Sequence, residues 1–294
     1  MDNQAKNREM QALISLVDEP DRLIFKDIAE RIHSFGPEAI PLLEREWEQT
    51  LNPAIQKRIE NLIRSIQFED VCAAFRYWVE GGCKDLFEGW MILVRFQYPQ
   101  VNEEDLHYEI NQIRKDIWLE INENLTALEQ VKVFNHVFYD IHGFSGDTET
   151  YHAPENSFIN KVLHSRKGNP LSLSLIYLML AQSLDMPVFG VNLPEHFILA
   201  YTGNTFDPQT METGKQSVLF YINAFSRGAV FSRKDVEDFV RQLKLESHSG
   251  YYEPCNNRDM IKRMLNNLVI AYEKAGAAQK AREMDQLRKI LNEG

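Results

Sequence analysis

The first quarter of the chain repeats apolar residues with the period of an α-helix. Two runs carry them at spacings of three or four residues: Ile24, Ile28 and Ile32, and later Ile55, Ile59, Leu62 and Ile66. This spacing places apolar side chains on one face of a helix. The pattern therefore predicts amphipathic helices over residues 8–16, 21–34, 38–49 and 53–66.

The segment FGPEAIPLLEREW (residues 35–47) shows where one of these helices begins. Gly36 is expected to end the preceding helix, and Pro37 suits the first turn of the next one. The segment resembles the second helix of a HEAT-type repeat, whose helix pair must stack on a neighbour to bury its apolar face. A plain helical bundle fits the same pattern. We expect residues 1–67 to form a helical, HEAT-like domain.

Helical spacing continues from residue 68 to residue 140, with Phe75, Trp78 and Trp90 among the expected core residues. The following stretch, IHGFSGDTETYHAPEN (residues 141–156), is rich in turn-forming residues and predicts a long loop. The helical pattern returns over residues 158–185, with an interruption near residues 168–170.

Short runs of branched and aromatic residues follow residue 187. They are VFGVNL, HFILAYT, NTFDP and SVLFYINAF, separated by glycine, asparagine and proline, and they read as antiparallel strands. Residues 232–244 return to the helical period, and Ser232 is the expected N-cap.

The last part of the chain predicts a helical hairpin over residues 257–275 and 277–292, joined near Gly276. Its pattern is similar to one tetratricopeptide unit, and one unit is too small for a solenoid. We therefore expect a core domain over residues 68–250 and a hairpin over residues 251–294 that docks on the core.

Composition is that of a globular protein. The chain has 294 residues, of which 44% are hydrophobic and 26% charged, so a sizeable core can be buried. The formal net charge of −11 argues against a nucleic-acid partner and an anionic membrane surface, because both require cationic protein surfaces. Cys72, Cys83 and Cys255 are odd in number and lack zinc-type spacing. We expect a soluble, cytoplasmic protein with no disulfide, metal or cofactor.

Five motifs carry a resemblance to a known family. They are N-S-F-I-N-x-V-L (156–163), R-x-G-x-P-x-S-L-S-L (166–175), L-P-x-H-F (193–197), D-P (207–208) and N-R-D-x-x-x-R-M-L-N-N-L (257–268). In this order they resemble the SirB1-like family of the transglutaminase-like superfamily. The resemblance implies an α+β, predominantly helical fold, in which a papain-like core with a small antiparallel sheet is flanked by helical modules.

The chemistry of that superfamily implies a site in three parts. A cysteine thiolate at a helix N-terminus is the nucleophile, a strand histidine is the base, and an acid on the next strand orients the histidine. In this sequence the resemblance assigns the base to His196 and the orienting acid to Asp207. The nucleophile position falls at about Pro170, and the similar family also carries proline there. Proline has no nucleophilic atom, although it suits the first turn of a helix.

Other residues could replace the missing nucleophile. Ser172 and Ser174 lie in the same predicted helix, but each points in a different direction from Pro170 at 100° per residue. Cys255, in a turn-rich segment, and Cys83, beside Gly81-Gly82, are the candidate thiols. Buried or incidental roles are the commoner ones for such residues.

Four polar residues are expected to border the cleft and to bind a partner: Asn156, Arg166, Ser172 and Glu195. Glu195 stands where the similar family often has glycine, and it could bind a cation, act as an acid or simply face solvent. Arg166 could pair with Asp207 or Glu195, or meet a substrate carboxylate, and Asn156 provides a helix N-cap signal. The remaining histidines show no metal-ligand spacing.

Three functions fit these observations. The first, which we favour, is a non-catalytic domain that binds a protein or peptide through the degenerate cleft and helical surfaces. The second is an amide hydrolase or acyl transferase that uses His196 and Asp207 with an unconventional nucleophile. The third is a structural protein that keeps this pair for stability. A fold resemblance cannot decide among them, because function resides in sites.

Overall fold

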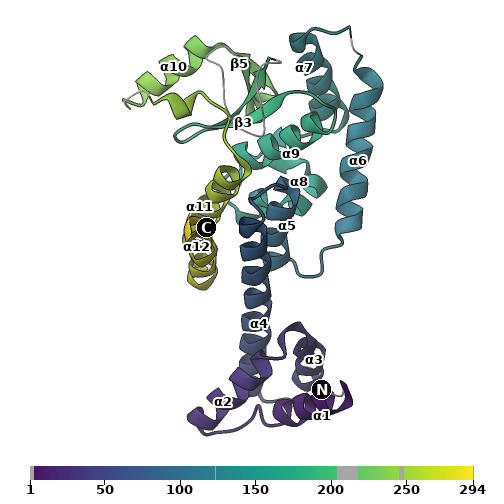
Figure 1. Cartoon of the computed structure of the whole chain (residues 1–294), viewed down its shortest axis with the longest axis vertical. Helices are drawn as coiled ribbons and strands as arrows, with labels where there is room; N and C mark the ends of the chain where they lie inside the picture. Colours follow the sequence, from purple (N-terminus) through teal and green to yellow (C-terminus); the bar gives the residue numbers. More distant parts are fainter. Residues whose placement is uncertain (1–2, 123, 204–217, 245–247, 294) are drawn as a thin grey trace. The chain divides into compact units, whose positions relative to one another are not determined.

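Figure 1 shows the computed structural model of the chain, which describes residues 3–122, 124–203, 218–244 and 248–293. The helices are α1 (Asn3–Ile14), α2 (Arg22–His33), α3 (Ile40–Gln49), α4 (Pro53–Glu80), α5 (Leu86–Gln97), α6 (Glu103–Glu120), α7 (Ala127–Asn135), α8 (Ile159–Ser165), α9 (Pro170–Gln182), α10 (Arg233–Gln242), α11 (Asn257–Lys274) and α12 (Ala278–Glu293). The strands are β1 (Ser145–Gly146), β2 (Lys167–Gly168), β3 (Val188–Asn192), β4 (Phe197–Thr202), β5 (Val218–Asn223) and β6 (Ala229–Phe231). The chain divides into two compact units, Met1–Tyr77 and Trp78–Gly294.

The N-terminal unit is entirely helical in its described part. Asp21 caps α2 by accepting hydrogen bonds from the backbone amides of Leu23 and Ile24. Gly36 adopts a left-handed φ of 62°, which glycine tolerates without strain, and the chain turns there into a short 3-10 helix. The core consists of the apolar helix faces: Met10, Ile14, Val17, Ile28, Ile32, Ala39, Leu43, Ile59, Leu62 and Ile66. The helical prediction for this region is confirmed.

The second unit is organised around α9, which packs against α8, β3 and β4. Ten of its residues are buried, and they lie on all sides of the helix. A helix that is buried all round loses its amphipathic pattern. This explains why residues 170–182 read as an almost continuous apolar run.

The main sheet is antiparallel, with the strand order β3-β4-β5-β6. Val191 pairs with Ile198, and Ala200 pairs with Tyr221, so these side chains share one face. Together with Val236 of α10 they form one core cluster. The opposite face, which carries Phe197 and Leu199, meets α9, and α10 and α9 therefore cover the two faces of the sheet (Figure 1).

The C-terminal helices α11 and α12 form the predicted hairpin, and Gly276 turns the chain between them with a φ of 72°. Helix α11 packs against α5, β3 and the 3-10 turn Pro154–Ser157. The Tyr272 hydroxyl donates a hydrogen bond to the Gln97 side chain at 2.8 Å. The hairpin is thus fixed to the rest of this unit by polar and apolar contacts.

The predicted fold class, α+β and predominantly helical, is confirmed by these elements. The predicted strand over residues 204–208 lies outside the described residues. None of the helices in the described part of the chain is long and apolar enough to cross a lipid bilayer.

Candidate functional site

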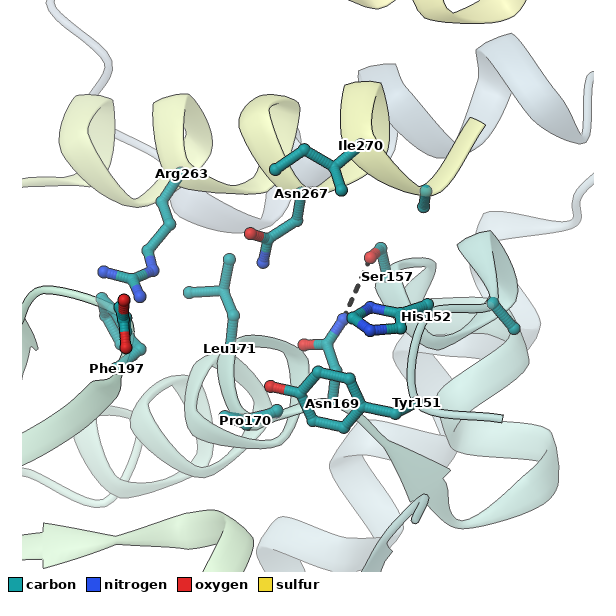
Figure 2. Close-up of a pocket in the computed structure, with 13 residues that line it drawn as sticks. Tyr151, His152, Ser157, Asn169, Pro170, Leu171, Phe197, Arg263, Asn267 and Ile270 are labelled. Carbon is teal, nitrogen blue, oxygen red and sulfur yellow. Dashed lines mark hydrogen bonds between the residues drawn. The ribbon is translucent and has the colours of Figure 1, made fainter. Parts of the chain in front are cut away.

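The N-terminus of α9 is built by a reciprocal capping box. The Asn169 side chain accepts a hydrogen bond from the Ser172 amide at 2.9 Å, and the Ser172 hydroxyl accepts one from the Asn169 amide at 3.0 Å. Pro170 occupies the first helical position, where its missing N–H leaves no bond unmade. The Asn169 Nδ2 also donates to the Ser157 Oγ at 3.0 Å, the bond drawn in Figure 2. The sequence Asn-Pro-x-Ser therefore fixes this helix end firmly.

A cavity of about 140 Å³ opens in front of this helix end. Figure 2 shows that side chains of α11 face the start of α9 across it. The lining residues are Tyr151, His152, Ala153, Ser157, Asn169, Pro170, Leu171, Glu195, Phe197, Arg263, Asn267, Ile270 and Ala271. This is much smaller than the roughly 300–1,000 Å³ of typical small-molecule sites. The cavity has room for about one side chain.

A hydrogen-bonded loop holds Tyr151 and His152 at this cavity. Asp147 is 7% exposed and accepts hydrogen bonds from the Glu149 and Thr150 amides at 3.0 and 2.9 Å. It also accepts one from the Thr150 hydroxyl at 2.5 Å. These bonds lower the pKa of Asp147 to about 2, and the bond from the Thr150 hydroxyl has the largest effect.

Arg263 of α11 closes the other side of the cavity. Its Nη1 donates hydrogen bonds to the Asn192 side chain at 2.5 Å and to the Leu193 carbonyl at 2.6 Å. Burial of the guanidinium lowers the pKa of Arg263. The arginine thus ties α11 to the turn between β3 and β4 and brings a cation to the cavity wall.

A family model described as "Transglutaminase-like superfamily" matches residues 104–266, which are more than half of the chain. The chain belongs to the transglutaminase-like superfamily. The match contains α9, the main sheet and part of α11, and so covers most of the candidate site.

Several curated relatives are similar to this member of the superfamily. A UPF0162 protein of Xylella fastidiosa is 30% identical over 214 residues, which are 68% of this chain and 70% of the relative. F-box only protein 21 of Mus musculus is 27% identical over 221 residues, 74% of this chain and 31% of the relative. A UPF0162 protein of Vibrio cholerae is 34% identical over 116 residues, 40% of this chain and 43% of the relative. The chain thus spans less than half the length of the last two proteins. No solved structure matches it.

The predicted base, His196, and the predicted nucleophile position, Pro170, line different cavities. His196 packs its ring on Phe239 of α10, with ring centroids 4.8 Å apart, and lines a second cavity. Pro170 lines the first cavity. His196 falls on the same side of the extended chain as Ile198 and Ala200, which face α10, because successive side chains of a strand alternate. Asp207 lies outside the described residues, so its hydrogen bond to His196 stays a prediction.

Glu195, the neighbour of His196, does line the first cavity beside Pro170. Its backbone has a left-handed φ of 60°, which is uncommon for residues other than glycine. Glycine adopts this conformation without strain. Glu195 is exposed, so its carboxylate faces solvent at the cavity mouth.

The serines of α9 are both fully buried. The Ser172 hydroxyl is occupied by the capping box, in which it also donates to the Asn169 carbonyl at 3.2 Å. The Ser174 hydroxyl is buried and has no hydrogen-bond partner among the described residues. Neither serine lines the first cavity. Their predicted alternative role as nucleophile has no support from this placement.

The candidate thiols are not poised as thiolates. Burial raises the pKa of Cys255 to about 12, and burial also raises the pKa of Cys83. A thiolate nucleophile requires the opposite shift. Neither residue lines the first cavity.

Arg166 and Asn156 support the surrounding structure. Arg166 pairs with Glu109 of α6 at 2.8 Å and lies over the Phe144 ring. Asn156 is buried and donates from its Nδ2 to Asp147 at 3.1 Å and to the Thr150 carbonyl at 2.7 Å. Neither lines the first cavity, although Asn156 stabilises the loop that does. Within the described residues, no group of three or more histidine, cysteine or carboxylate side chains could hold a metal ion.

The contribution of α11 to the cavity was not predicted from the sequence. Arg263 and Asn267 both line the cavity and lie four residues apart, so they share one helix face. Both belong to the N-R-D-x-x-x-R-M-L-N-N-L motif. The signal was therefore present in the sequence, but nothing in the spacing alone showed that this helix would face α9.

Proposed function

We propose that this protein is a non-catalytic, SirB1-like member of the transglutaminase-like superfamily that binds a segment of a protein or peptide. The binding site is the cavity between the N-terminus of α9 and α11. The HEAT-like and tetratricopeptide-like helical segments add surfaces for the same partner. The expected cytoplasmic location is part of this proposal.

The observation that carries the proposal is the chemistry of the helix end. The resemblance assigns the superfamily's nucleophile to about Pro170, which occupies the first helical position and offers no nucleophilic atom. The nearest hydroxyl in the helix, that of Ser172, is buried and bonded within the capping box. The capping box therefore preserves the N-terminus of α9, but it supplies no nucleophile that could form an acyl-enzyme.

The lining of the cavity supports recognition of a polypeptide. Tyr151 and Ile270 are 42% and 49% exposed, so they offer apolar surface to a partner. Asn267 and Arg263 place an amide and a guanidinium beside that surface. Polar donors and acceptors next to apolar surface suit a peptide that places one side chain in the cavity, because the backbone groups beside that side chain then need hydrogen-bond partners.

Peptide selection with a matched pair of variants tests the proposal. Random peptides displayed on phage are selected on the full chain, and enriched peptides are titrated by fluorescence anisotropy. Asn267→Trp fills the cavity from α11, and we expect it to weaken binding by at least about tenfold. Lys262→Trp places the same side chain at an exposed position of α11 that does not line the cavity, and it should leave binding unchanged.

Two results would count against the proposal. Enriched peptides that bind Asn267→Trp as tightly as the wild-type chain would place recognition elsewhere. Failure to enrich any peptide would remove the binding role. Thermal unfolding of both variants controls for loss of the fold.

A further inference from the structure

A second cavity, of about 430 Å³, lies on the α10 side of the main sheet, away from the site described above. Its floor is apolar and consists of the buried residues Leu193, Ile198 and Val236. These three belong to the core cluster between the sheet and α10, so the floor is fixed by packing. The cavity is therefore a formed feature of this unit.

Aromatic rings stand around this floor. Phe239 of α10 and Phe231 of β6 are half-buried, and the exposed His196 ring is tilted at 57° to that of Phe239. The face of an aromatic ring carries partial negative charge and attracts a cation within about 6 Å of its centroid. The rings of Phe231 and Phe239 thus favour a ligand with a positive end.

Carboxylates add to this preference. Asp235 and Asp238 both line the cavity, whereas none of its described lining residues is lysine or arginine. The Asp235 Oδ2 accepts hydrogen bonds from the Ser232 amide at 2.7 Å and the Ser232 hydroxyl at 2.6 Å, which hold the carboxylate in place and lower its pKa.

Asp238 has an exchangeable partner. Its Oδ1 accepts a hydrogen bond from Arg241 at 2.9 Å, but the Arg241 side chain is 78% exposed. Exposed ion pairs of this kind contribute little stability, so a second cation can share the carboxylate. The nearby Arg233 lies over the Tyr252 ring and pairs with Glu237, outside the cavity lining.

We propose that this cavity binds a lysine or arginine side chain of a partner polypeptide. The aliphatic stem lies on the apolar floor, and the charged end reaches Asp238 between the aromatic walls. Lysine and arginine combine these two properties, since their methylene stems bury readily while the charge stays near water. The formal net charge of −11 favours the approach of such a basic segment.

Four short peptides test the proposal on the full chain. Each is an acetylated, amidated pentaglycine whose central residue is replaced by lysine, arginine, norleucine or citrulline. Binding is followed by amide chemical shifts in nuclear magnetic resonance spectra. We expect the lysine or arginine peptide, or both, to bind with a Kd on the order of 1 mM, and the uncharged peptides to bind at least about tenfold more weakly.

Two charge reversals on α10 provide a matched comparison. Asp238 and Glu237 are adjacent, and their side chains are 44% and 42% exposed, but only Asp238 lines the cavity. Asp238→Lys should weaken binding of the cationic peptides by about tenfold or more. Glu237→Lys should weaken it by no more than about twofold. Phe239→Leu removes the aromatic ring but keeps an apolar side chain, and it should weaken binding of the cationic peptides without changing binding of the norleucine peptide.

Three results would overturn the proposal. A norleucine peptide that binds as tightly as the lysine and arginine peptides would make the cavity a general apolar site. Equal losses in Asp238→Lys and Glu237→Lys would show only a diffuse electrostatic attraction. The absence of shifts around the cavity at about 10 mM of either cationic peptide would show that the cavity is not a cation site.

Discussion

Ser172 and Ser174 lie two residues apart in α9 and are both fully buried, yet their replacement by alanine should change stability in opposite directions. The difference follows from their hydrogen bonds. Ser172 closes the capping box with Asn169, whereas the Ser174 hydroxyl has no hydrogen-bond partner in the described part of the chain.

Ser172→Ala removes the acceptor of the Asn169 amide, a bond of 3.0 Å in a buried setting. A buried amide left without a partner costs about 1–3 kcal/mol. The higher helix propensity of alanine returns about 0.5 kcal/mol. We expect a net destabilisation of about 1–2 kcal/mol.

Ser174→Ala removes a buried hydroxyl that makes no stabilising hydrogen bond to the described residues. The desolvation cost of such a group is about 1 kcal/mol or more, and alanine again adds about 0.5 kcal/mol of helix propensity. The loss of one oxygen atom from the packed core offsets part of this gain. We expect a net stabilisation of about 0.5–1.5 kcal/mol.

Urea unfolding followed by tryptophan fluorescence measures both changes. The chain has four tryptophans, and a Trp47→Phe background leaves only Trp78, Trp90 and Trp118, which belong to the second unit. The signal then reports the unit that contains α9. In thermal scans each kcal/mol should shift the Tm by about 2–4 °C.

Changes of the same sign in the two variants would refute this reasoning. Destabilisation by Ser174→Ala of more than about 1 kcal/mol would show that its hydroxyl has a partner. A neutral Ser172→Ala would show that the capping box does not hold the helix end.

Other predictions follow from the site. Cys83 and Cys255 have raised pKa values, about 12 for Cys255, so iodoacetamide at pH 7.5 should alkylate both far more slowly than glutathione, and equal rates by mass spectrometry would contradict this. Asp147 has a pKa lowered from 3.8 to about 2, so its stabilisation is present above pH 3.8 and lost as the pH falls toward 2. Urea midpoints at pH 5 and pH 2 should therefore differ more in the wild-type chain than in Asp147→Asn. Glu195→Gly should relieve the strain of the left-handed backbone at this position and stabilise the protein by about 0.5–1 kcal/mol. Glu195→Ala should give no such stabilisation, and paired urea titrations measure the difference.

The helices and strands were largely predictable from local pattern. Residues 53–80 form one helix, however, whereas the apolar pattern predicts a helix that ends at residue 66. No glycine or proline occurs in residues 54–80 to end it, so the boundary had no physical signal. Strands β1 and β2 have two residues each, which is too short for a side-chain period to be detected.

The site was harder to predict because it depends on which face of a strand meets which helix. Strand β4 is buried along its whole length on both faces, so its sequence shows no alternation of polar and apolar residues. Adjacent residues of an extended chain face opposite sides, and Phe197 lines the first cavity while Ile198 lines the second. The motif located His196 in the chain but could not show that it would face α10.

The most direct test of the account is to measure the intact masses of both partners after a selected peptide is incubated with the full chain. The account predicts that the peptide binds and that both masses stay unchanged, because Pro170 provides no nucleophile. Cleavage or deamidation of the peptide, or an acyl adduct on the protein, would contradict it and identify an enzyme.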